Sequence, residues 1–175
     1  FYQEIINTIL GGSMSSKLFI NIRELSGFAY DIHSDLISFT DTGALVISAG
    51  INPKNLYSAI DQILSQIATF SYNIEEKDIW NAKQLLTGRL LLDSENTNSV
   101  AYKIGQDYLF FDKSDTLQET ISKINNVQLT DLLQFCDDVF KNSNISMAVV
   151  GPNRGSIKMS RIIQSFSREN SNFLM

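Results

Sequence analysis

The segment Leu10–Tyr30, which reads LGGSMSSKLFINIRELSGFAY, constrains the fold of this chain more than any other. It places a glycine pair, a serine-rich helix start, an amphipathic helix, a single glycine and a strand in succession. Glycine reaches the left-handed conformation of a helix C-cap without a Cβ clash, and serine side chains cap the free N–H groups of a following helix. The segment therefore predicts a helix–helix–strand corner, with Gly11 and Gly12 ending the first helix and Gly27 ending the second.

Two polar side chains, Arg23 and Tyr30, flank the turn predicted at Gly27. Because residues two apart share a strand face, Tyr30 is expected to point to the same side as Ile32. A guanidinium offers five fixed donors and a phenol one more, which suits a carbonyl or carboxylate oxygen, including that of a peptide backbone. Spacing alone leaves an ordinary alternative open, in which Arg23 pairs with a nearby carboxylate and Tyr30 is a core residue with its hydroxyl at the edge.

The run from Gly11 to Tyr30 resembles the signature of the second, non-catalytic domain of pitrilysin-type (insulinase-like) zinc peptidases, the family that includes insulin-degrading enzyme and mitochondrial processing peptidase. Lys17 and Phe28 replace the usual arginine and leucine of that signature and preserve charge or apolar character. The resemblance continues more loosely to about Pro152. The matching positions are Gly11, Gly12, Met14, Ser16, Leu18, Ile22, Arg23, Glu24, Gly27, Ala29 and Tyr30.

The resemblance implies that this chain is the substrate-binding half of a zinc-dependent processing peptidase. Arg23 and Tyr30 would then hold a peptide substrate in a chamber, and the catalytic zinc would lie on a partner domain in the same or another chain. No activity is expected from this chain alone, and no cofactor within it. A catalytically inert scaffold or interaction subunit of the same fold is the alternative. The resemblance also implies a strand before Phe1, so we expect a fragment of a longer protein.

Length and composition are those of a globular domain. The 175 residues are expected to form one domain over 1–175, with 153–175 as a peripheral tail. An apolar content of 43% with 19% charged residues fits a soluble protein, and no apolar run approaches the roughly 18 residues of a membrane span. The net charge of −5 argues against general nucleic-acid binding. No signal peptide is visible, which slightly favours the cytoplasm.

The order of predicted elements indicates the fold class. FAYDIH reads as a strand that residues 36–39 extend or pair with, and GALVISAGI is a strand whose continuous apolar character predicts an inner position with both faces covered. Helices are expected from Asn52, Glu75, Ser99, Thr116 and Thr130, and a last strand at ISMAVVG. Together these predict an α+β fold, a mostly antiparallel sheet with helices packed on one face.

The sequence contains no recognisable catalytic or metal-binding set. His33 is the only histidine, whereas the catalytic half of the resembled family uses an H-x-x-E-H motif. A catalytic zinc takes three protein ligands, and His33 with Asp31 and Asp35 on one strand face does not match that geometry. We therefore interpret His33 as a partly exposed residue on a polar strand face. The single cysteine, Cys136, shares a helical stripe with apolar residues and is expected to be a buried core thiol.

Overall fold

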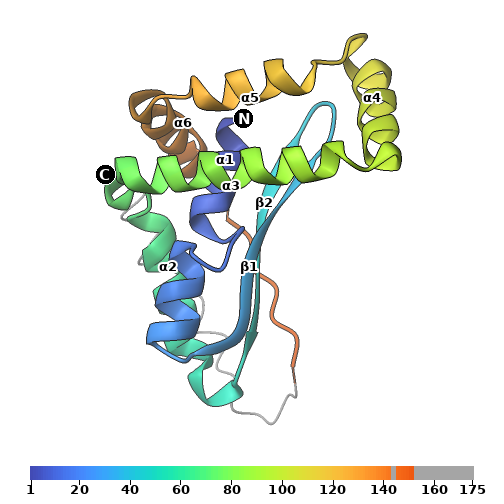
Figure 1. Ribbon diagram of the computed structural model, residues 1–175. Coiled ribbons are helices and arrows are strands. Elements are labelled where there is room, and N and C mark those ends of the chain that lie inside the picture. Colours follow the sequence, from blue (N-terminus) through green and yellow to red (C-terminus); the bar gives the residue numbers. More distant parts are fainter. Residues whose placement is uncertain (143–144, 152–175) are drawn as a thin grey trace.

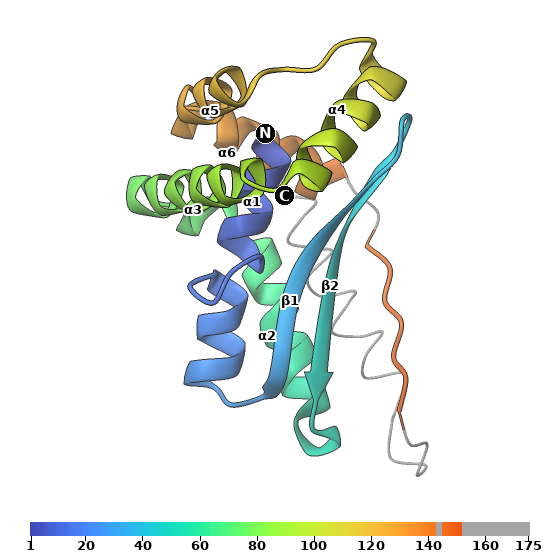
Figure 2. The ribbon, with the colours of Figure 1, turned by 45° about the vertical axis from the view of Figure 1, so that its right-hand side comes forward.

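The computed structural model describes residues 1–142 and 145–151. It has an α+β architecture in which a long antiparallel hairpin lies against a group of helices (Figures 1 and 2). The predicted fold class is therefore confirmed. The elements, in chain order, are α1 (Tyr2–Leu10), η1 (Phe19–Leu25), β1 (Ala29–Ser38), β2 (Gly43–Ile51), η2 (Pro53–Asn55), α2 (Leu56–Ala68), η3 (Ser71–Asn73), α3 (Glu76–Ser94), α4 (Thr97–Phe111), α5 (Leu117–Asn125) and α6 (Leu129–Asn142).

The core lies between the helices and one face of the hairpin. The apolar stripe of α1 and the inward residues of η1, β1 and α6 meet there, which gives each of these elements a buried face. Phe70, just after α2, closes one end of this core against Phe140, with ring centroids 5.6 Å apart. Nine residues of this core are at most 2% exposed: Ile5, Leu10, Leu18, Ile22, Ile32, Phe70, Ile79, Leu132 and Cys136.

Gly11 ends α1 for a reason that differs from the predicted one. Its φ of −152° is extended backbone that any residue can adopt, so the expected left-handed cap is wrong at this position. A Cβ at Gly11 would instead lie 2.6 Å from the backbone nitrogen of Ser34 on β1. The Ser34 N–H donates to the Gly11 carbonyl at 3.2 Å. Glycine is therefore required here by close approach of α1 to β1.

One member of the serine-rich stretch caps the helical turn at residues 17–18 that leads into η1. Ser16 is 1% exposed, and its Oγ accepts from the Phe19 N–H at 3.4 Å. Ser13 and Ser15 contact each other instead, with their hydroxyl oxygens 3.2 Å apart. The helix that follows contains the π-helical segment Phe19–Leu25, whose Ile22 is fully buried.

The hairpin matches the predicted strands closely. β1 continues to Ser38, so residues 36–38 extend the first strand, and β2 covers the predicted GALVISAGI. The strands pair from Ala29↔Ile51 to Ser38↔Gly43, with a bulge between Ala29 and Asp31. The expected inner position of β2 is wrong for the described residues, among which β2 pairs with β1 alone.

Helix starts follow the capping chemistry of the sequence. Asn52 accepts from the Lys54 N–H at 3.0 Å and leads through Pro53 into η2 and then α2. The predicted capping box of α5 is confirmed, because the Thr116 N–H donates to Glu119 and the Glu119 N–H donates to Thr116 Oγ1 at 3.2 Å.

The C-terminal part departs from the sequence predictions. α6 begins at Leu129, so Thr130 lies inside the helix and does not cap it. Residues 145–150 run extended beside β2 without joining its ladder within the described part of the chain (Figure 2). The predicted tail over 153–175 lies outside the described residues. No helix of the described ranges is both long and apolar enough to cross a membrane.

Candidate functional site

Arg23 lies on η1 and is held by two neighbours on its own helix. Its guanidinium carbon stacks 4.6 Å from the centroid of the Phe19 ring, a cation–π contact. Its Nε is 3.7 Å from Oε1 of Glu24, and both side chains of this ion pair are partly exposed. An exposed pair at this distance contributes little to stability. The guanidinium is therefore oriented by Phe19, and the Arg23 side chain remains 40% exposed.

The turn after η1 ties the backbone of this helix to the start of β1. Gly27 has a φ of 63°, in the left-handed region that disfavours side chains, and its N–H donates to the Arg23 carbonyl at 3.2 Å. The Phe28 N–H donates to the Ile22 carbonyl at 3.0 Å. A Cβ at Gly27 would meet no atom within 4 Å, so conformation alone selects glycine here.

Tyr30 points away from the core, contrary to the strand alternation. The bulge between Ala29 and Asp31 inserts Tyr30 as an extra residue, so Ala29 and Ile32 are both buried while Tyr30 is 77% exposed. Its ring lies against Gly50, where a Cβ would come within 2.2 Å of the Tyr30 ring. The expectation that Tyr30 and Ile32 share a face is therefore wrong, as is the alternative of a core tyrosine. A glycine within the apolar strand β2 was the available signal of this close approach.

The outer face of β1 continues from Tyr30 into a polar row. His33 Nδ1 lies 3.2 Å from Asp31 Oδ2, and His33 Nε2 lies 3.4 Å from Asp35 Oδ2. His33 is 45% exposed, which confirms the interpretation of a partly exposed residue on a polar strand face. Within residues 1–142 and 145–151, no group of three His, Cys, Asp or Glu side chains could hold a metal ion.

Polar contacts attach this corner to α3. Lys17 Nζ lies 2.7 Å from Asp78 Oδ2, in an ion pair of which each side chain is less than a quarter exposed. Arg89 donates from Nη2 to the Gly12 carbonyl at 3.0 Å. Lys17 therefore serves as a structural cation that joins the helix start to α3.

Arg23 and Tyr30 thus occupy one corner without binding each other in the described part of the chain. The turn at Gly27 separates their elements, and each side chain presents hydrogen-bond donors to solvent. The arrangement can donate to an oxygen of an external ligand, such as a peptide carbonyl. Cys136 offers no nucleophile, because burial, and then the charge of Asp137, raise the pKa of its thiol to about 12.

Comparisons with known proteins agree with the motif at this corner. Residues 1–86 match the family model described as the peptidase M16 inactive domain. The chain is 34% identical over 149 residues to the uncharacterized zinc protease YmxG of Bacillus subtilis, covering 85% of this chain and 36% of the relative. An uncharacterized zinc protease of Mycobacterium leprae is 31% identical over 151 residues, covering 85% and 33%. The chain therefore spans about a third of the length of these relatives.

Solved structures share the fold. A conserved protein from Enterococcus faecalis superposes with a TM-score of 0.70 and 26% identity, covering 77% of this chain and 32% of that one. A protease from Helicobacter pylori gives a TM-score of 0.64 at 20% identity, covering 78% and 33%, a likeness that concerns the fold alone. From the motif, the family model and the relatives together, this chain belongs to the peptidase M16 family, in which it corresponds to the inactive domain.

Proposed function

We propose that this chain is the substrate-binding half of a zinc-dependent peptidase and that Arg23 and Tyr30 bind the backbone of the peptide. The zinc would lie on a catalytic domain in the same or another chain, and there it would supply Lewis-acid chemistry toward the scissile carbonyl and water. The names of the relatives as zinc proteases support this proposal. So does their greater length, which leaves room for a catalytic domain outside the aligned region.

The observation that carries the proposal is the exposure of Tyr30. A tyrosine that is 77% exposed, turned out of the core by a bulge and set against a glycine does little for packing. Bulges commonly re-aim a side chain beside a functional site. Its hydroxyl and the Arg23 guanidinium are donors that can hold a peptide carbonyl and stabilise negative charge as it develops on the oxygen.

The test is turnover by the assembled enzyme. Replacing one preorganised oxyanion donor typically lowers kcat by about 10² to 10³, and we expect Arg23→Ala to lower peptide turnover by at least about 10². Tyr30→Phe should lower turnover by about tenfold, the loss expected for one hydrogen bond. Zinc content, measured by atomic absorption, should be unchanged in both variants.

A matched control separates binding from general surface effects. Lys113→Ala removes an exposed cation from the connection between α4 and α5, at the opposite end of the hairpin from Tyr30 (Figure 1), and should leave turnover unchanged. Normal turnover in Arg23→Ala would show that the role assigned to Arg23 is wrong. Loss of zinc from Arg23→Ala would instead indicate damage to the assembly, and Tyr30→Phe would then decide.

A scaffold or interaction subunit is the second candidate, and the surface of α4 favours it. Tyr102, Tyr108 and Phe111 are each more than half exposed, and no residue of α4 is buried. Aromatic side chains of this kind are enriched in protein interfaces. If this candidate function is correct, Arg23 and Tyr30 would only stabilise the helix–helix–strand corner. Their replacement would then reduce the free energy of unfolding, whereas residues that face a substrate should change it little.

A further inference from the structure

The helix that carries Arg23 contains a π-helical turn, an uncommon form of backbone. η1 spans Phe19–Leu25, so Arg23 lies inside this wider turn. π-Helical turns are rare and often lie at functional sites. Because an α-helix turns by about 100° per residue, one residue accommodated in such a turn redirects the side chains that follow it. The direction of Arg23 therefore depends on whether this turn keeps its π-helical form.

The contacts of the Arg23 side chain leave its direction to the backbone of η1. The Phe19 ring lies four positions earlier on the same helix, with 4.6 Å between the guanidinium carbon and the ring centroid. The Glu24 carboxylate, 3.7 Å from Nε, belongs to that helix too. Since both contacts come from η1 itself, a change in the backbone of this helix moves the guanidinium and these neighbours together.

A hydrogen bond from α2 reaches this turn from outside η1. Asn21 Nδ2 donates to Oε1 of Gln66 at 2.9 Å, across 45 positions of the sequence. Asn21 lies two positions before Arg23, which places the two side chains on roughly opposite sides of the helix. The Asn21 carbonyl also accepts from Ser26 Oγ at 2.7 Å, a bond that bridges the wide turn. Asn21 therefore holds the turn through both its side chain and its carbonyl.

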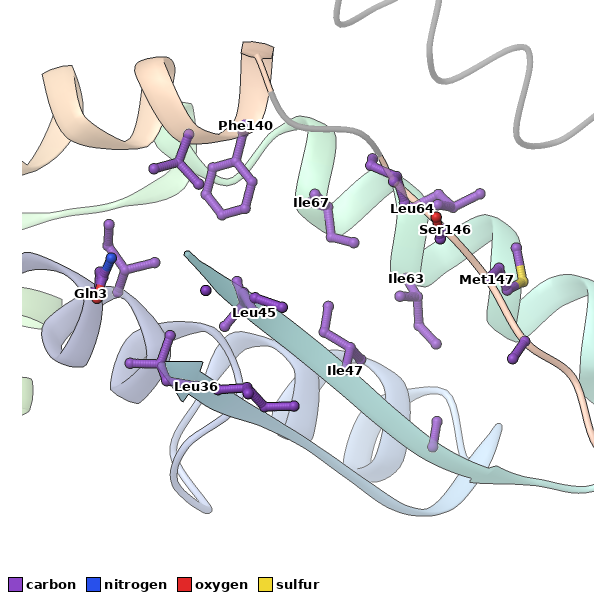
Figure 3. A pocket seen from close by; sticks show the side chains of 18 of the residues that line it. Gln3, Leu36, Leu45, Ile47, Ile63, Leu64, Ile67, Phe140, Ser146 and Met147 are labelled. Carbon is purple, nitrogen blue, oxygen red and sulfur yellow. The ribbon is translucent and has the colours of Figure 1, made fainter. Parts of the chain in front are cut away.

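α2 gives this bond a fixed point, because the helix is anchored by its apolar side. Figure 3 shows Ile63 and Ile67 of α2 pointing toward Ile47 of β2 across an apolar groove. Ile63 packs against the main core, and Leu64 is buried. Gln66 lies on the side of α2 that faces η1, and the two helices lie side by side in Figures 1 and 2. The hydrogen bond therefore ties η1 to a helix that is anchored in the core.

We propose that Asn21 and Gln66 are positioning residues for Arg23, and that their hydrogen bond holds the π-helical turn of η1 in the form that directs the guanidinium at the peptide. This inference rests on the proposed function, in which Arg23 binds the peptide backbone. A misplacement of about 1 Å can cost about 10²-fold in rate, even when the mutation that causes it lies far from the chemistry. Loss of this one hydrogen bond is therefore enough to lower turnover, without any contact between Gln66 and the peptide.

A double-mutant cycle in the assembled enzyme tests the proposal, with a mixture of internally quenched fluorescent peptides as the probe. Gln66→Leu removes the acceptor and keeps a side chain of similar size, and we expect it to lower kcat/KM by about 10- to 100-fold. In the Arg23→Ala background the same substitution should cause no further loss, because a residue that acts through Arg23 then has nothing to position. Gln66→Glu keeps an acceptor oxygen for Asn21 and should retain most of the turnover.

Gln62→Leu is the matched control. Gln62 lies one turn earlier on α2, and its Oε1 has no hydrogen-bond partner among the described residues, so the same substitution there removes no acceptor that η1 uses and should leave kcat/KM unchanged. An equal loss from Gln66→Leu in the presence and absence of Arg23 would indicate a merely structural bond and overturn the proposal, and so would normal turnover in Gln66→Leu. Normal turnover in Arg23→Ala would instead refute the proposed function itself, and with it this inference. If Gln66→Leu does not fold, Asn21→Ala decides by the same cycle.

Discussion

Gly11→Ala is expected to destabilise this domain strongly, because the backbone of β1 leaves no space for a methyl group. A Cβ at Gly11 would lie 2.6 Å from the Ser34 backbone nitrogen and 2.5 Å from its Oγ. Contacts below 3 Å force a shift, and here part of the obstacle is backbone. Ser34 is 2% exposed, and its Oγ donates to Asn7 Oδ1 at 2.6 Å, so it cannot move freely.

The expected loss follows from the contacts that must change. Overpacking a tight site costs about 1 to 3 kcal/mol. Separating α1 from β1 also weakens the hydrogen bond from the Ser34 N–H to the Gly11 carbonyl, at about 1 kcal/mol. The smaller unfolded-state entropy of alanine offsets roughly 0.5 kcal/mol. The net decrease in the free energy of unfolding is therefore about 1.5 to 3.5 kcal/mol, or about 3 to 14 °C in Tm for a chain of this length.

The assay is urea unfolding followed by circular dichroism, with Gly105→Ala as the matched control. Gly105 lies within α4 and has no atom within 4 Å of an added Cβ. The same methyl group should stabilise there by about 0.5 to 1 kcal/mol, because alanine is the better helix former. The two substitutions should therefore have opposite signs. If Gly11→Ala unfolds at the same urea concentration as the parent, the close approach of α1 and β1 is not what selects glycine.

Three further predictions concern single features of the chain. Gly27→Ala should lower the free energy of unfolding, measured in urea, by about 1 kcal/mol, because a φ of 63° is strained for alanine although no atom crowds the site. An unchanged free energy of unfolding would contradict the backbone conformation assigned to Gly27. The Cys136 thiol, with a pKa raised to about 12, should resist alkylation at pH 8 until the domain unfolds, and rapid alkylation of the folded protein would refute this. The free energy of unfolding should also fall as the pH rises above about 9, because only the unfolded state then loses the thiol proton. Thr116→Ala removes the cap of α5 and should cost about 1 kcal/mol, whereas Thr130→Ala, which lies inside α6, should cost clearly less in the same thermal melts.

Local features of the fold were predictable from the sequence. The bounds of β2, the cap at Asn52 and the capping box at Thr116 depend on residues within a few positions of one another. The burial of Cys136 follows from its place on an apolar stripe of α6. The motif containing Arg23 and Tyr30 identified the family, because its matched residues all lie within twenty positions of the chain.

Other features depend on contacts between distant segments, and only the tertiary structure revealed them. The requirement for glycine at Gly11 comes from Ser34 on β1, and the outward turn of Tyr30 comes from a bulge in its pairing with β2. Strict alternation along a strand holds only while the ladder is regular, and one inserted residue reverses the face.

The sequence by itself determined most of the helices, the two strands of the hairpin and the family to which the corner belongs, because capping, turn and periodicity signals are local. The tertiary structure decided which side Tyr30 faces, why Gly11 cannot carry a side chain, and that, within residues 1–142 and 145–151, the apolar strand β2 pairs with β1 alone. These depend on the pairing of backbone groups far apart in the chain. Pairing partners are set by the packing of whole elements, so no local pattern specifies them.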